Sequence, residues 1–172
     1  PTVLNVTDKQ VTAGESTVLN CYGVTLADET VPPSSWTMSG IIGSLTPNTK
    51  YKLWGCIASD TVEHSPATWV EFTTKKSAIS DDAKGTLAGY TGVYDGNPHD
   101  AITGAAQAGY TVEYSTNNAT SGFSGIMPKV TNVADSKTVW VKLSKTGHVD
   151  KVVERAAAVT EKSISGATIT YG

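Results

Sequence analysis

The sequence is poor in basic residues and has no long apolar run. Thirteen of its 172 residues are Lys or Arg, with Arg155 as the single arginine, and 16 are Asp or Glu, so the formal net charge is −3. Proteins that bind nucleic acid usually carry a basic surface that neutralises phosphates. A membrane-spanning helix needs about 20 consecutive apolar residues. We therefore expect no nucleic-acid partner and no direct membrane insertion.

The sequence also lacks the patterns that catalysis and cofactor binding require. His64, His99 and His148 lie in turn-like segments without the His-x-His or His-x-x-x-His spacing of a metal site. We expect solvated histidines there, with a surface metal or ligand site at one of them as the alternative. Catalysis would need a cleft lined by paired carboxylates or by a nucleophile linked to a histidine, and the sequence indicates neither. We therefore predict neither an enzyme nor a bound cofactor.

What the sequence does contain is typical of β structure. Thr and Val are abundant and suit a pleated sheet, and 16 Gly and 7 Pro interrupt the chain. The length allows two small domains. Segments rich in β-branched and aromatic residues, many of them alternating, predict strands at residues 3–6, 17–22, 35–38, 51–57, 68–74, 110–115, 138–144 and 152–159. The polar run at 75–84 is predicted to be a linker.

A turn and a strand in the first half match a known family. Leu45, Pro47, Thr49 and Tyr51 form a Leu-x-Pro-x-Thr-x-Tyr pattern, and the next predicted strand ends in Phe-Thr-Thr. Together they resemble the last third of a fibronectin type III module. The resemblance implies a β-sandwich over residues 1–76, in which Tyr51 closes a tyrosine corner.

The second half resembles a different family. Residues 90–99 read Tyr-x-Gly-x-Tyr-Asp-Gly-x-Pro-His, residues 112–116 read Val-x-Tyr-Ser-Thr, and residues 139–148 read Val-Trp-Val-Lys-Leu-Ser-Lys-x-Gly-His. These patterns are similar to the MBG-type immunoglobulin-like repeats of bacterial surface proteins. The resemblance implies a second β-sandwich over residues 77–163, followed at 164–172 by a linker and the start of a next module.

Taken together, the two halves predict an all-β chain of two immunoglobulin-like β-sandwich domains in tandem. We expect a fragment of a bacterial cell-surface or secreted protein, located outside the cell. Its expected role is that of a non-catalytic spacer that takes part in adhesion, with neighbouring modules of the same chain as partners. Two alternatives remain open. One is a module that binds a glycan or a host surface protein, and the other is an accessory domain of a secreted polysaccharide-degrading enzyme.

The two cysteines allow two interpretations. Cys21 and Cys56 are 35 residues apart, and immunoglobulin domains join two such cysteines between their sheets. Alternation from Tyr51, however, places Cys56 on the outward face with Lys52 and Trp54. A bond between sheets needs both sulfurs in the core, so it would require a bulge at Gly55 that reverses the alternation.

Three tryptophans are predicted to face outward, Trp54 and Trp69 on adjacent strands of the first domain and Trp140 in the second. They would pack across strands, contact a neighbouring module or partner, or form a platform for a sugar ring. Asp81 and Asp82 raise the further alternative of structural calcium, with Asp95 or Asp135 as added ligands. The other interpretation is a solvated acidic linker.

Overall fold

The computed structural model describes residues 1–58 and 65–163. The predictions for His64 and for residues 164–172 lie outside this part. The chain divides into two compact units. Unit 1 comprises Pro1–Ser77 with Gly147–Val149, and unit 2 comprises Ala78–Thr146 with the residues from Asp150 onward.

Unit 1 is a sandwich of two three-stranded antiparallel sheets. The first has the order β1-β2-β4 and the second the order β3-β5-β6. The strands are β1 (Val3–Val6), β2 (Val11–Ala13), β3 (Cys21–Leu26), β4 (Ile41–Ile42), β5 (Lys50–Cys56) and β6 (Thr68–Thr73). This is the connectivity of an immunoglobulin-like sandwich, in which the first, second and fourth strands form one sheet and the third, fifth and sixth form the other.

The core of unit 1 lies between these sheets. Val11 and Ala13 come from one sheet, and Tyr51, Leu53 and Phe72 come from the other. Tyr51 and Leu53 are two residues apart on β5, so the alternation predicted for this strand is confirmed. The tyrosine corner is also present, because the backbone N–H of Thr46 donates to the Tyr51 hydroxyl at 3.0 Å.

Two strand predictions in unit 1 are wrong. The segment 17–22 is not a strand over most of its length, because the Ser16 hydroxyl accepts hydrogen bonds from the N–H groups of Val18 and Leu19. Such a side-chain turn competes with strand pairing. Residues 35–38 contribute a single bridge, in which Thr37 exchanges both backbone hydrogen bonds with Tyr22.

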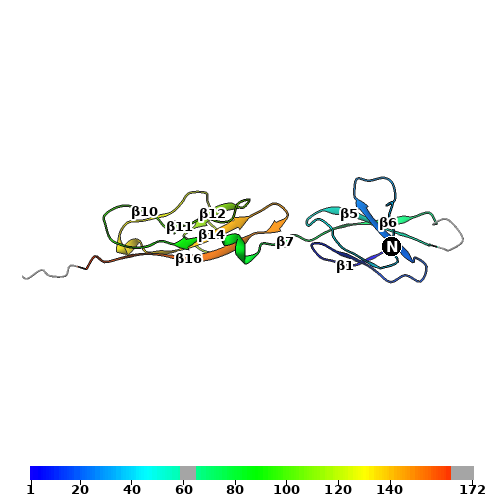
Figure 1. The fold of residues 1–172 in the computed structure, drawn as a ribbon, viewed down its shortest axis with the longest axis horizontal. Coiled ribbons are helices and arrows are strands. Elements are labelled where there is room, and N and C mark those ends of the chain that lie inside the picture. The colour runs from blue at the N-terminus through cyan, green and yellow to red at the C-terminus, as the bar shows by residue number, and fades with distance from the viewer. Residues whose placement is uncertain (59–64, 164–172) are drawn as a thin grey trace, which may run out of the picture. The chain divides into compact units, whose positions relative to one another are not determined.

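Unit 2 is built on a four-stranded sheet with the order β12-β14-β16-β9. These strands are β12 (Thr111–Ser115), β14 (Lys137–Ser144), β16 (Lys151–Thr160) and β9 (Thr91–Val93). Figure 1 shows the long strand β16 beside β14, with which it pairs antiparallel. Its pairing with β9 is parallel.

Unit 2 also contains two short antiparallel ladders. They are β8 (Ala88–Gly89) with β11 (Ile102–Thr103), and β10 (His99–Asp100) with β13 (Lys129–Val130). Val139, Val141 and Leu143 of β14 are fully buried, as their alternation predicts. The remaining elements are β7 (Ser77–Ala78), β15 (His148–Val149) and the 3₁₀ turns η1 (Asp81–Lys84) and η2 (Val133–Asp135).

The predicted linker at 75–84 is wrong for most of its length. It contains β7 and η1, and the apolar side chains of Ile79 and Ala83 lie in the core of unit 2 with Leu87. The charged residues between Ile79 and Ala83 face solvent. The linker was predicted because these charged residues make the segment polar in composition.

Candidate functional site

The tryptophan pair of unit 1 lies on the outward face of the β3-β5-β6 sheet. Trp54 of β5 is directly opposite Trp69 of β6, as the alternation predicts. The ring centroids are 6.2 Å apart and the ring planes are tilted by 54°. This geometry is a cross-strand aromatic contact, the first of the arrangements considered from the sequence.

Although Trp54 faces outward as predicted, it is only 4% exposed, whereas Trp69 is 49% exposed. A loop covers the sheet beside Trp54. Gly23 lies opposite Trp54 on β3, and a Cβ atom added at Gly23 would stand 2.4 Å from Cγ of Pro33. The outward face of a strand is exposed only where no other segment packs on it, and here Pro33 does.

Polar contacts complete the cover over this face. The Trp54 indole N–H donates to the Thr25 hydroxyl at 2.8 Å. The Lys52 ammonium donates to the Glu29 carbonyl at 2.6 Å and stands 4.7 Å from the centroid of the Trp69 ring. Of the two tryptophans, Trp69 is therefore the exposed one, and the Lys52 cation lies against its ring.

Trp140 occupies a comparable position in unit 2. It lies on the face of β14 opposite the buried valines and is half-buried. On the same face, Lys142 pairs with Glu113 at 2.6 Å and stands 4.9 Å from the Phe123 ring centroid. Trp140 belongs to unit 2, whereas Trp54 and Trp69 belong to unit 1.

Cys21 and Cys56 form a disulfide. They are the last register pair of β3 and β5, with Cα atoms 5.2 Å apart. The bond therefore lies within one sheet, on the outward face with Trp54. The prediction considered only a bond between sheets and took the outward direction of Cys56 as evidence against it. Two outward cysteines that are paired on adjacent antiparallel strands are also close enough to form a disulfide, so no bulge at Gly55 is needed.

Two of the acidic residues considered for calcium, Asp81 and Asp135, have other partners. The Asp81 carboxylate pairs with Lys151 at 2.5 Å, and Asp135 caps η2 by accepting from the backbone N–H groups of Thr131 and Asn132. Within residues 1–58 and 65–163, no group of three His, Cys, Asp or Glu side chains is placed to hold a metal ion. Calcium binding stays a prediction.

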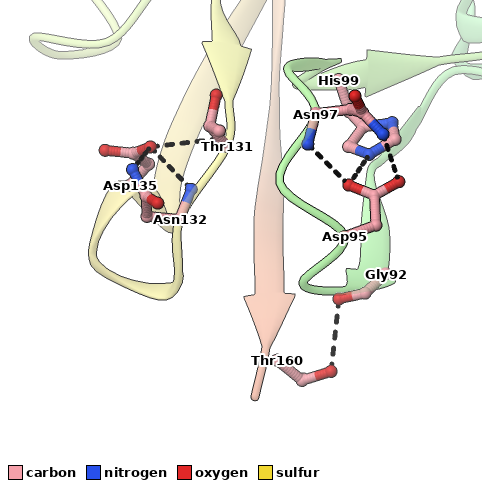
Figure 2. A network of polar contacts seen from close by, with 8 residues as sticks. All are labelled: Gly92, Asp95, Asn97, His99, Thr131, Asn132, Asp135 and Thr160. Atoms are coloured by element: carbon pink, nitrogen blue, oxygen red, sulfur yellow. Dashed lines mark hydrogen bonds and ion pairs between the residues drawn. The ribbon is translucent and has the colours of Figure 1, made fainter. Parts of the chain in front are cut away.

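Asp95 organises a turn of unit 2 that contains one of the predicted histidines. Figure 2 shows its carboxylate between Asn97 and His99. One oxygen accepts from the Asn97 backbone N–H at 2.9 Å and lies 3.0 Å from Nε2 of His99, whose ring stacks on Tyr90. The Asn97 and His99 hydrogen bonds hold the Asp95 pKa at about 2. These contacts give the turn a structural role.

A groove beside β3 could not be recognised from the sequence. It has a volume of about 560 Å³ and is lined mainly by residues of β3, by Trp36 and by Ile42, Leu45 and Tyr51. These residues come from segments far apart in the chain, and each is ordinary in its own segment. The groove is apolar, with no acid–base pair among its lining residues.

Comparison with known proteins identifies no family. No model of a protein family matches the chain, and no curated protein matches it. Among solved structures, the chain is similar to the FN1–FN3 domains of chicken CNTN1, with 14% sequence identity and a TM-score of 0.32. That match covers 93% of this chain and 64% of the length of the CNTN1 chain. None of the helices described is both long and apolar enough to span a membrane.

Proposed function

We propose that this chain is a pair of non-catalytic spacer modules of a larger extracellular protein, located on a bacterial cell surface or secreted. Its partners would be neighbouring modules of the same protein. The observation that carries the proposal is the parallel pairing of β9 and β16. These are an early strand and the last described strand of unit 2, and they form a ladder from Ala158↔Thr91 to Thr160↔Val93.

This pairing suits a module that transmits tension. Tension pulls β9 toward its amino end and β16 toward its carboxyl end. Because the strands are parallel, these pulls slide one strand past the other and load the evenly spaced hydrogen bonds together. In an antiparallel pair of terminal strands, the same tension would load the bonds one after another from one end. Further bonds support the ladder, from Ala158 N–H to the Tyr90 carbonyl and from Tyr94 N–H to the Thr160 carbonyl.

The disulfide supports the proposed location. Disulfides persist in oxidising environments and are rare in the cytosol of most organisms. Cys21 and Cys56 are 2% and 0% exposed, so the folded unit shields their sulfur atoms from thiol exchange. A bond at this position is a structural staple, as expected of a small domain outside the cell.

Single-molecule force measurement on the whole chain tests the proposal. We expect unit 2 to open at a higher force than unit 1. Tyr94→Pro removes the N–H that bonds to Thr160 and should lower the opening force of unit 2. Tyr94→Ala is the matched control, since it removes the ring and keeps the N–H. The proposal fails if unit 2 opens at or below the force of unit 1, or if the two variants behave alike.

A second candidate function is binding through Trp69. The observation that favours it is the 49% exposure of this aromatic side chain, and aromatic rings commonly contribute to recognition. The partner would be a glycan or a host surface protein. A glycan array probed with the wild-type chain and with Trp69→Ala tests this candidate, and absence of wild-type binding would count against a glycan ligand.

A further inference from the structure

We propose that the Cys21–Cys56 disulfide gives unit 1 two lengths under tension. Unit 1 is shorter while the bond is intact and longer after the bond is reduced. The inference rests on the spacer function proposed above. It adds a redox-dependent extension that the spacer function alone does not require. Three features of unit 1 carry it: the placement of its terminal strands, the position of the bond and the strands that the bond encloses.

The terminal strands of unit 1 share no ladder. The first strand, β1, belongs to the β1-β2-β4 sheet, and the last, β6, belongs to the β3-β5-β6 sheet. A hydrogen bond from the Lys75 N–H to the Thr7 carbonyl, at 3.0 Å, links the segments just beyond them. Tension on the ends of unit 1 therefore loads the packing between its sheets. We therefore expect unit 1 to open at a lower force than unit 2, in which the parallel ladder of β9 and β16 resists sliding.

The disulfide then diverts tension around the middle of unit 1. Once β1, β2 and β6 detach, the force passes from Cys21 to Cys56 through the sulfur atoms, and the enclosed residues bear none of it. The two Cα atoms stay 5.2 Å apart across a sequence separation of 35 residues. An unbonded chain of that length would extend by about 120 Å, at roughly 3.5 Å per residue.

The enclosed part also keeps a native strand pairing. The β3–β5 ladder runs from Cys21↔Cys56 to Leu26↔Tyr51, so apart from the cysteines it lies within the bypassed loop. Leu53, which is 0% exposed in the intact unit, pairs with Val24 there. Oxidised unit 1 should therefore reach only part of its full length while β3 and β5 stay in register.

Reduction by a dithiol releases the remaining length through thiol–disulfide exchange. One thiolate of the dithiol attacks a cysteine sulfur, forms a mixed disulfide and displaces the other cysteine as a thiolate, which takes up a proton. The second thiol of the reagent then displaces the first cysteine and closes a cyclic disulfide. Two electrons pass from the dithiol to the protein, which ends with two cysteine thiols.

The experiment holds the whole oxidised chain at constant force and adds dithiothreitol. After unit 1 opens, we expect one further step of about 120 Å, at a rate that rises with dithiothreitol concentration. The Cys21→Ser/Cys56→Ser double variant should show the full extension of unit 1 at once, with no later step. A wild-type chain that shows no dithiothreitol-dependent step overturns the inference. So does a step far from the expected length.

These outcomes are separate from those of the spacer proposal. If unit 2 opens before unit 1, the proposed transmission of tension through β9 and β16 fails, and the dithiothreitol-dependent step still tests the disulfide. If the double variant does not fold, the wild-type experiment remains decisive, because it begins from the oxidised native chain.

Discussion

Trp54 and Trp69 face each other across β5 and β6 with their ring centroids 6.2 Å apart, yet Trp54 is 4% exposed and Trp69 is 49% exposed. One member of the pair is part of the packing of unit 1, and the other meets solvent. The Pro33 segment lies against Gly23, the β3 residue opposite Trp54, and so contributes to this difference. Substitutions of the two residues should therefore have different effects.

Trp54→Ala should destabilise unit 1 by about 3–5 kcal/mol, the usual cost of emptying a buried aromatic site. Trp69→Ala should cost about 1 kcal/mol, because it removes one cross-strand aromatic contact and little burial. Peptide-resolved hydrogen exchange of the whole chain measures the free energy of opening for each unit. Equal costs at the two positions would contradict the assignment of Trp54 to the packed interior.

Gly89→Ala should destabilise unit 2 by about 3 kcal/mol through overpacking. A Cβ atom added at Gly89 would stand 1.8 Å from the carbonyl oxygen of Ala156, so β8 could not keep its approach to β16. Gly125→Ala is the matched control, since its Cβ would meet nothing within 4 Å. Thermal unfolding of the two variants checks this, and a neutral Gly89→Ala would show that β8 does not lie against β16.

Tyr51→Phe should cost unit 1 about 1 kcal/mol, because the backbone N–H of Thr46 loses the hydroxyl that accepts its hydrogen bond. The ring itself is kept, so its stacking on Phe72 at 5.7 Å should persist. Tyr94→Phe, at a position that is 42% exposed, serves as a surface control. Urea unfolding measures both variants, and similar midpoints would count against the tyrosine corner.

Asp95 should make unit 2 lose stability in acid. Its pKa is lowered from 3.8 to about 2 in the folded state, so the folded chain binds this proton less readily than the unfolded chain does. The stability that the carboxylate contributes is complete above about pH 4 and is lost as the pH falls toward 2. Asp95→Asn should lower stability at pH 7, and its difference from the wild type should shrink and vanish as the pH falls through 2. A constant difference between variant and wild type across this range would refute the assignment.

The sequence was informative wherever burial follows alternation along one strand. Val139, Val141 and Leu143 could be assigned to the core because every second residue of a strand faces the same side. Tyr51 could be assigned to its corner because turn and strand are contiguous in the chain. Both inferences depend on local residues, and both are confirmed.

The features that sequence reasoning missed depend on distant segments. Alternation gives the face on which Trp54 lies, but it does not show that Pro33 covers that face. It places Cys56 outward, but it does not show that Cys21 lies opposite it on the neighbouring strand. The local signals were a glycine on β3 and a Pro-Pro pair in the next loop, and both features are common in strands and loops that cover nothing. In the same way, the charged residues beside Ile79 and Ala83 gave no indication that these two side chains are buried in the core of unit 2.

The order in which unit 2 is made follows from the position of β16. This strand pairs with both β14 and β9, and it is the last described strand of the chain. The ladder with β9 joins segments that are far apart in sequence, and such contacts form late. During synthesis, the sheet of unit 2 therefore stays incomplete until residue 160 has left the ribosome.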